Sequence, residues 1–256
     1  MIAEAIILGV IQGLTEFFPV SSTAHLIVVP WLFGWKGDVN TLTFDIALHA
    51  GTLTALIFSF WKDWIDLFTK KQRLLGLIII ASIPAGAVGF LLNDIVETTL
   101  RKPFLISLML VAVGFIMLAA EKSAKKKSLE GTGFLDALVI GIAQAVAIIP
   151  GVSRSGITIS AGLFRGLKRD ASARFSFLIS TPIIAGATLL HLKKFLTSQE
   201  PHDLHLFTAG FISSSITGFF AIIFLLNFLK KYPLNLFVYY RFILSVVIIA
   251  GIWLRG

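Results

Sequence analysis

The sequence predicts an all-α integral membrane protein with six transmembrane helices and two re-entrant helical hairpins, arranged as an inverted-topology repeat. Three observations predict this fold. Only 14% of the 256 residues are charged and the mean hydropathy is +0.89, whereas about a quarter of the residues of a soluble domain are charged. Several apolar segments are long enough to cross a bilayer. Two further apolar regions are interrupted by proline, glycine and serine.

The spanning helices are predicted from segment length, because a helix needs about 20 apolar residues to cross the hydrocarbon core. Six segments qualify, at roughly 42–61, 74–93, 103–120, 172–195, 206–229 and 236–254. Residues 1–18 are also apolar, but they include Glu4 and lack a basic start and a small-residue cleavage site. We therefore do not expect them to be a removed signal peptide. The absence of cysteine excludes disulfides and thiolate metal sites.

The two interrupted regions predict hairpins that do not cross the membrane. Residues 2–35 are broken by FPVSST at 18–23, and residues 134–165 are broken by PGVSRSG at 150–156. Neither arm of either region is long enough to span easily. Such breaks expose backbone groups that lipid cannot satisfy, so they occur only where protein surrounds them or where they line a cavity. We expect both tips to lie inside the protein.

The two hairpins also predict an internal repeat. Four positions match at an offset of 132 residues: Gly9, Gln12, Val20 and Ser21 with Gly141, Gln144, Val152 and Ser153. Residues 1–121 and 134–256 would then be two repeats of one membrane domain, 1–256, joined by a cytoplasmic linker at 122–133. Each repeat has one hairpin and three spans, so the second repeat must be inverted. In such folds the matching breaks indicate the functional site.

Lysine and arginine predict the orientation. Fourteen of them belong to one side, which contains residues 62–73, 121–133, 165–171 and 230–235 with Arg241 near its edge, against six on the other side. Cytoplasmic loops carry the excess of lysine and arginine, so both termini face outward. The net charge of +8 is then explained by topology, and we expect no nucleic-acid partner.

Polar residues at the two tips predict an anion site. They are Gln12, Glu16, Ser21, Ser22, Thr23 and His25 in the first hairpin, and Ser153, Arg154, Ser155 and Gly156 in the second. Serine and threonine favour helix N-caps, and helix N-termini attract anions. Gln12 and Glu16 share a helix face, and Ser22 and His25 are neighbours three residues apart. Arg154 would bind a phosphate in a planar, bidentate manner.

Structural interpretations compete with this one. Arg154 could cap carbonyls or extend towards the membrane surface, and the serines, threonines and His25 could simply pack. Asp45 and His49, four residues apart, could support the site or pair with each other. The conjunction of Glu16 and Arg154 with the other polar tip residues at two matched breaks favours a functional site, because intramembrane charges are costly.

At these residues the sequence resembles the undecaprenyl-pyrophosphate phosphatase family of the bacitracin-resistance type, over the whole chain. The motifs that carry the resemblance are QGLTEFFPVSSTAH and PGVSRSG. The resemblance implies the same fold and the removal of the terminal phosphate from the C55 isoprenoid diphosphate, which recycles the cell-wall lipid carrier. It places the site at the outer face of the bacterial plasma membrane. The family's functional positions fall on Glu16, Ser22, His25 and Arg154, with Ser21, Thr23, Ser153 and Ser155 beside them.

The resemblance also implies a divalent cation, Mg²⁺ or Ca²⁺. The first acidic position of the family motif is often glutamate, but this chain has Gln12, so a two-carboxylate metal site with Glu16 is in doubt. The substrate diphosphate would instead carry the cation, assisted by Glu16.

We expect Ser22 to attack the terminal phosphorus and His25 to take the Ser22 proton, with Glu16 orienting His25 or binding the cation. Attack by His25 or by water remains open. A secondary transporter or flippase of an anionic substrate is the alternative class, because inverted repeats with broken helices are typical of transporters. The expected partners are the polyprenyl diphosphate substrate and membrane lipids, and a homodimer also remains open.

Overall fold

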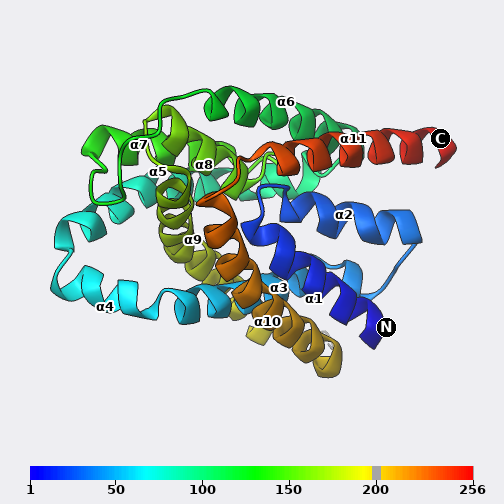
Figure 1. Ribbon diagram of the computed structural model, residues 1–256. Coiled ribbons are helices and arrows are strands. Elements are labelled where there is room, and N and C mark those ends of the chain that lie inside the picture. Colours follow the sequence, from blue (N-terminus) through cyan, green and yellow to red (C-terminus); the bar gives the residue numbers. More distant parts are fainter. Residues whose placement is uncertain (198–202, 256) are drawn as a thin grey trace.

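The computed structural model describes residues 1–197 and 203–255, and their regular structure is helical (Figure 1). The elements are α1 (Ile2–Phe17), α2 (Ser22–Phe33), η1 (Asp38–Asn40), α3 (Leu42–Ser59), α4 (Trp61–Thr69), α5 (Gln72–Thr99), α6 (Pro103–Glu121), α7 (Phe134–Val146), α8 (Arg154–Phe164), α9 (Arg169–Thr197), α10 (Leu204–Leu229) and α11 (Asn235–Arg255). The predicted all-α class is confirmed.

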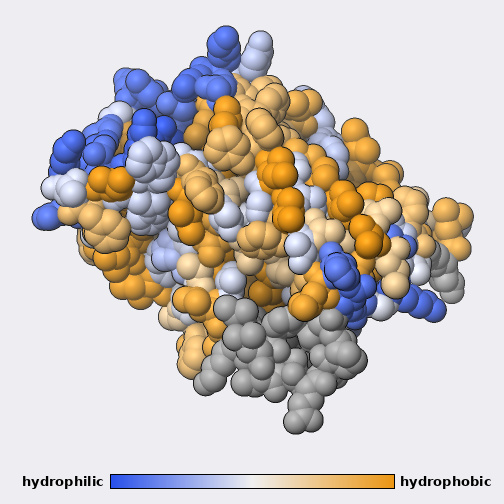
Figure 2. All heavy atoms as spheres, turned by 90° about the horizontal axis from the view of Figure 1, so that it is seen from below, coloured by the Kyte–Doolittle hydropathy of each residue, from blue (hydrophilic) through white to orange (hydrophobic). Residues whose placement is uncertain are grey.

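Six of these helices are long and apolar enough to cross a membrane, namely α3, α5, α6, α9, α10 and α11. They correspond one by one to the six predicted segments, and the chain is a multi-pass membrane protein. Large apolar side chains such as Phe90, Phe115 and Trp253 point outward. Figure 2 shows apolar side chains over much of one face, with a large group of hydrophilic ones at one end and a smaller group towards the other. Helix α4 was not predicted, and it covers part of the charged segment 62–73.

The predicted breaks separate two pairs of short helices, α1 with α2 and α7 with α8, and each pair packs together. Within the described residues, Ser21 and Ser153 are the non-glycine residues with positive φ, at 77° and 71°. The hydroxyl of Ser21 accepts from the Ala24 N–H, and that of Ser153 accepts from the Gly156 N–H. Few L-residues adopt this conformation. The same turn therefore recurs 132 residues apart.

Each short helix pair packs against helices of the other half of the chain. Helix α1 packs on α10, α7 packs on α5, α3 packs on α9, and α6 packs on α11. Matching glycines permit two of these contacts. A Cβ on Gly9 would lie 2.6 Å from the Gly210 carbonyl oxygen, and a Cβ on Gly141 would lie 2.5 Å from the Ala81 carbonyl oxygen. Small residues allow helix backbones in membranes to approach closely.

Arg241 corrects one sequence expectation. The sequence predicts that Arg241 lies near the cytoplasmic edge of the membrane, but the structure buries its side chain fully in the interior. Its guanidinium donates hydrogen bonds to the backbone carbonyls of five residues: Pro19, Met109, Leu110, Gly151 and Val152. The two broken regions leave carbonyls without helical partners, and inside a membrane only protein can supply their donors. Arg241 thus joins both turns to α6.

The two ends of the chain lie at the same end of the molecule. Figure 1 shows the start of α1 and the end of α11 together, while α4 lies at the opposite end. At that opposite end, Lys127 of the linker before α7 forms an ion pair with the Asp136 carboxylate of the second half, which Arg165 also binds. This arrangement brings the α1–α2 turn and the α7–α8 turn together in the middle.

Candidate active site

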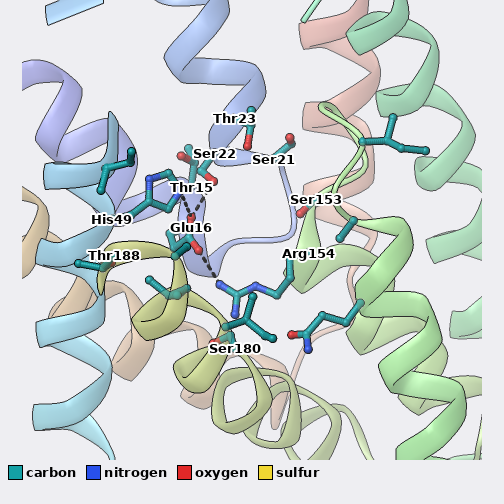
Figure 3. Close-up of a pocket in the computed structure, with 17 residues that line it drawn as sticks. Thr15, Glu16, Ser21, Ser22, Thr23, His49, Ser153, Arg154, Ser180 and Thr188 are labelled. Carbon is teal, nitrogen blue, oxygen red and sulfur yellow. Dashed lines mark hydrogen bonds and ion pairs between the residues drawn. The ribbon is translucent and has the colours of Figure 1, made fainter. Parts of the chain in front are cut away.

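A cavity of about 260 Å³ lies where the two turns meet. Its walls come from α1, α2, α3, α7, α8 and α9, and it is lined by side chains from both halves of the chain (Figure 3). The polar lining includes Glu16, Ser22 and Thr23 from the first half and Ser153 and Arg154 from the second. The prediction that polar residues of both tips meet therefore agrees with the structure.

Glu16 is the centre of the polar network. Its Oε1 accepts a hydrogen bond of 2.6 Å from Nη2 of Arg154, 138 residues away in the sequence. Its Oε2 accepts 2.7 Å and 3.0 Å hydrogen bonds from Ser22 Oγ and Gln12 Nε2. Only 7% of the Glu16 residue is exposed. A buried carboxylate needs such donors, and here one of them is a hydroxyl that borders the cavity.

Arg154 contributes only part of its guanidinium to this network. Helix α8 begins at Arg154, and Ser153 caps it, so the side chain leaves the helix N-terminus and extends towards Glu16 (Figure 3). Nη1 is buried and has no hydrogen-bond partner. The guanidinium can therefore bind a further anion in addition to Glu16.

His25 does not occupy the position that the sequence suggested. Its Nδ1 lies 2.7 Å from the Ser21 carbonyl oxygen, and its Nε2 lies 2.7 Å from the Tyr240 hydroxyl. The ring stacks on Tyr240 and is buried, and it is not part of the cavity lining. The expected transfer of the Ser22 proton to His25 has no supporting contact, because the ring faces α11 and both its nitrogens are engaged.

Three other predicted binding residues also lie outside the cavity lining. Gln12 points at Glu16, Ser155 donates to the Phe18 carbonyl at 3.1 Å, and Gly156 donates its N–H to Ser153. Ser155 thereby attaches the second turn directly to the first. Each of these contacts is made within the protein, and Oε1 of Gln12 stays buried without a hydrogen-bond partner. These residues therefore shape the site rather than border the cavity.

The structure decides whether Asp45 and His49 pair with each other's side chains or lie at the site. Asp45 pairs with Arg101 at 3.1 Å. His49 borders the cavity, with Nδ1 2.7 Å from the Asp45 carbonyl oxygen and Nε2 3.6 Å from Glu16 Oε2. His49 therefore supports the site, while the Asp45 carboxylate belongs to an ion pair with Arg101.

Comparison with known proteins decides the family. The family model described as bacitracin resistance protein BacA matches residues 5–247. The chain belongs to the BacA family. It is 58% identical over 253 residues to an undecaprenyl-diphosphatase of Thermodesulfovibrio yellowstonii, covering 99% of this chain and 98% of that protein. Undecaprenyl-diphosphatases of Desulforudis audaxviator and Caldicellulosiruptor bescii are 46% and 45% identical, each over 99% of this chain and 98% of their own.

Among the described residues of this BacA family member, the cavity lining does not form a site in which protein side chains alone would hold Mg²⁺ or Ca²⁺. Such cations take six or more oxygen ligands, with carboxylates prominent among them. Among the described residues there is no group of three or more His, Cys, Asp or Glu side chains that could hold a metal. Glu16 is the one carboxylate of the cavity lining, and both its oxygens accept hydrogen bonds from the protein.

Sequence reasoning did not assign a role to four polar residues of this BacA cavity: Thr15, Gln144, Ser180 and Thr188. Ser180 and Thr188 belong to the apolar span α9, where isolated hydroxyls usually bond to their own helix. Gln144 did carry a signal, because it matches Gln12 in the repeat. That match indicated the repeat but not the direction of the side chain.

Proposed function

We propose that this chain hydrolyses undecaprenyl diphosphate to undecaprenyl phosphate and inorganic phosphate, which recycles the lipid carrier of the cell wall and confers bacitracin resistance. The observation that carries the proposal is the hydrogen bond from Ser22 to Glu16, beside Arg154, at the cavity between the two turns. Membership of the BacA family and full-length relatives named undecaprenyl-diphosphatase support the substrate.

Ser22 is the nucleophile in this proposal. Its hydroxyl proton passes to Glu16 Oε2 as Oγ forms a bond to the terminal phosphorus. The bond from that phosphorus to the bridging oxygen breaks, undecaprenyl phosphate leaves with the proton that Glu16 holds, and a phosphoserine remains. Water then attacks the phosphoserine, gives its proton to Glu16 and releases inorganic phosphate. Ser22 recovers its proton from Glu16. The 2.7 Å contact supports Glu16, rather than His25, as the proton acceptor.

Arg154 and the helix N-termini stabilise the negative charge that develops on the phosphoryl oxygens, which is the main requirement of phosphoryl transfer. His49 holds the Glu16 carboxylate in place from α3. His25 positions α2 through Tyr240. A divalent cation, where required, arrives on the substrate diphosphate, because the described lining of the cavity offers one carboxylate, Glu16. No step is assigned to the cation.

The proposed fold has two re-entrant hairpins, α1–α2 and α7–α8, in inverted repeats at 1–121 and 134–256 that form one membrane domain, with the linker 122–133 in the cytoplasm. The matched turns at Ser21 and Ser153 support the repeat. Without Arg241, thirteen of the fourteen cations remain in the four cytoplasmic loops, against six on the other side. This asymmetry supports termini and an active-site opening at the outer face of the plasma membrane.

A carrier or flippase of a phosphate-bearing substrate is the second candidate. The observation that favours it is that helices of each half pack against helices of the other half, with the cavity at the junction of the two halves. Transporters built from inverted repeats bind their substrate at the junction of the two repeats. A carrier needs Arg154 but has no use for a hydroxyl held on a carboxylate.

The test is phosphate release from undecaprenyl diphosphate by the purified protein in detergent, with Mg²⁺, with Ca²⁺ and with EDTA. We expect release by the parent chain and a loss of at least about a hundredfold in Arg154→Ala, the scale on which removal of one charge-stabilising donor acts. Loss of release in EDTA alone would support a cation on the substrate. No release from folded parent protein in any condition would favour the carrier.

A further inference from the structure

We propose that Gln144, Thr188 and Nη1 of Arg154 form a second phosphate subsite, which holds the phosphate that stays on the lipid. This inference rests on the proposed function and deepens it. Ser22 and Glu16 occupy the wall where the attacked phosphate must lie, so the diphosphate's other phosphate has to contact a different wall. The wall formed by α7, α8 and α9 carries the polar atoms that are free to do this.

Unpartnered polar atoms concentrate at this wall. Within the described part of the chain, nine buried side-chain nitrogen and oxygen atoms have no hydrogen-bond partner, and four of them belong to cavity-lining residues. These four are Nε2 and Oε1 of Gln144, Nη1 of Arg154 and Oγ1 of Thr188. Burying a polar atom without a partner lowers stability, so such a concentration around one cavity indicates groups that are satisfied by a ligand.

Gln144 is the strongest member of the set, because only 3% of it is exposed and both ends of its amide are unpartnered. Its match in the first repeat, Gln12, donates to Glu16 four residues later. The residue four positions after Gln144 is Ile148, whose side chain cannot accept a hydrogen bond. The amide of Gln144 on α7 therefore lacks the hydrogen-bond partner that Glu16 provides for Gln12 on α1.

The other described residues of this wall make no hydrogen bond to the amide. Ala147, Ile183 and Ile184 line the same cavity with apolar side chains, and the Ser180 hydroxyl donates to the Phe177 carbonyl. Figure 3 shows Arg154 extending into the space between Glu16 and Ser180.

A phosphate on this wall can accept hydrogen bonds from Gln144 Nε2, Thr188 Oγ1 and Arg154 Nη1, while a bridging water can donate to Oε1. One cation and two neutral donors then recognise the second phosphate. This assignment makes Gln144 a specificity residue that distinguishes a diphosphate from a monophosphate.

The test compares Gln144→Met with the parent chain, purified in detergent, with inorganic pyrophosphate and orthophosphate as probes. Methionine keeps the volume and removes both polar atoms. We expect the inhibition constant for pyrophosphate and the KM for undecaprenyl diphosphate to rise about tenfold, the effect of losing one hydrogen bond to a charged group. The inhibition constant for orthophosphate and kcat should change less than about threefold.

The thermal midpoint of the free protein provides a second readout. It should stay equal or rise in Gln144→Met, because an unpartnered amide is removed, while the stabilisation by pyrophosphate should fall. Ser172→Ala is the matched control, because it removes another buried, unpartnered hydroxyl that is not part of the cavity lining. It should leave pyrophosphate binding unchanged. Thr188→Val should weaken pyrophosphate binding in the same direction as Gln144→Met.

Pyrophosphate binding by both Gln144→Met and Thr188→Val with the parent's affinity would overturn the subsite. That result is distinct from failure of the proposed function, in which the parent chain binds pyrophosphate but releases no phosphate from the lipid. Weakened pyrophosphate binding in the variants would support the subsite in either case.

Discussion

At the scale of single residues, Glu16 organises the site because it joins three functions in one carboxylate. It neutralises Arg154, it fixes the Ser22 hydroxyl, and it lies beside His49. Residue type and an apolar setting were enough to predict that Glu16, Ser22 and Arg154 come together, and their roles stay predictions. They were not enough for His25, because a spacing of three residues from Ser22 does not show whether the ring faces the cavity or α11.

The contact between His25 and Tyr240 gives the first prediction. Tyr240→Phe and His25→Gln should each lower the free energy of unfolding by about 0.5–1.5 kcal/mol, the net contribution of one hydrogen bond. The double variant should cost much less than the sum, because both changes remove the same contact. Thermal or denaturant unfolding in detergent measures this. Fully additive losses would show that the two side chains act independently.

At the scale of elements, the two turns are held by groups that the sequence does not reveal. The spans were predictable because apolar length alone specifies them, and the breaks were predictable from proline and glycine in apolar surroundings. The position of Arg241 was not predictable, since it depends on which carbonyls α11 meets after folding. The pairing of α1 with α10 and of α7 with α5 likewise depends on complementary surfaces rather than on local pattern.

Arg241 gives a prediction about these turns. Arg241→Met should lower the free energy of unfolding by at least about 3 kcal/mol, because it leaves several buried carbonyls without donors. Arg241→Lys should recover part of the loss, since an ammonium can reach fewer of the five carbonyls. Thermal midpoints of the three proteins in one detergent provide the measurement. A stable, fully active Arg241→Met protein would refute the role in joining the turns.

The glycine contacts give a third prediction. Gly141→Ala should destabilise the protein, because its Cβ would lie 2.5 Å from the Ala81 carbonyl oxygen and force α7 away from α5. Gly89→Ala on α5 is the control, since a Cβ there meets nothing within 4 Å. It should be neutral or stabilising by up to about 1 kcal/mol from helix propensity. Equal effects of the two substitutions on the thermal midpoint would contradict the packing account.

At the scale of the whole molecule, the two halves contribute different parts of one site. The first half supplies Ser22 and Glu16, and the second supplies Arg154 and the wall with Gln144. In the proposed inverted repeat the two similar turns would meet from opposite directions, because each hairpin would return to the side from which it enters. The charge asymmetry of the loops supports the proposed orientation, in which the two ends of the chain lie outside the cell.

This orientation predicts the labelling of engineered thiols, which is simple to measure because the chain has no cysteine. Ser128→Cys, exposed in the linker, should be protected from a membrane-impermeant maleimide added to intact cells. Asn40→Cys, exposed after α2, should react. Detergent should make both thiols reactive. The opposite pattern in intact cells would reverse the proposed topology.

The most direct test of the central claim is phosphate release by Ser22→Ala beside Ser21→Ala, each purified and confirmed as folded. The proposed mechanism predicts that Ser22→Ala loses at least about a hundredfold in kcat and forms no acid-stable phosphoenzyme. Ser21→Ala should still form a labelled phosphoserine at Ser22. Its free energy of unfolding should fall by about 1 kcal/mol, the contribution of a helix N-cap. Full activity in Ser22→Ala would contradict the account and leave water or another side chain as the nucleophile.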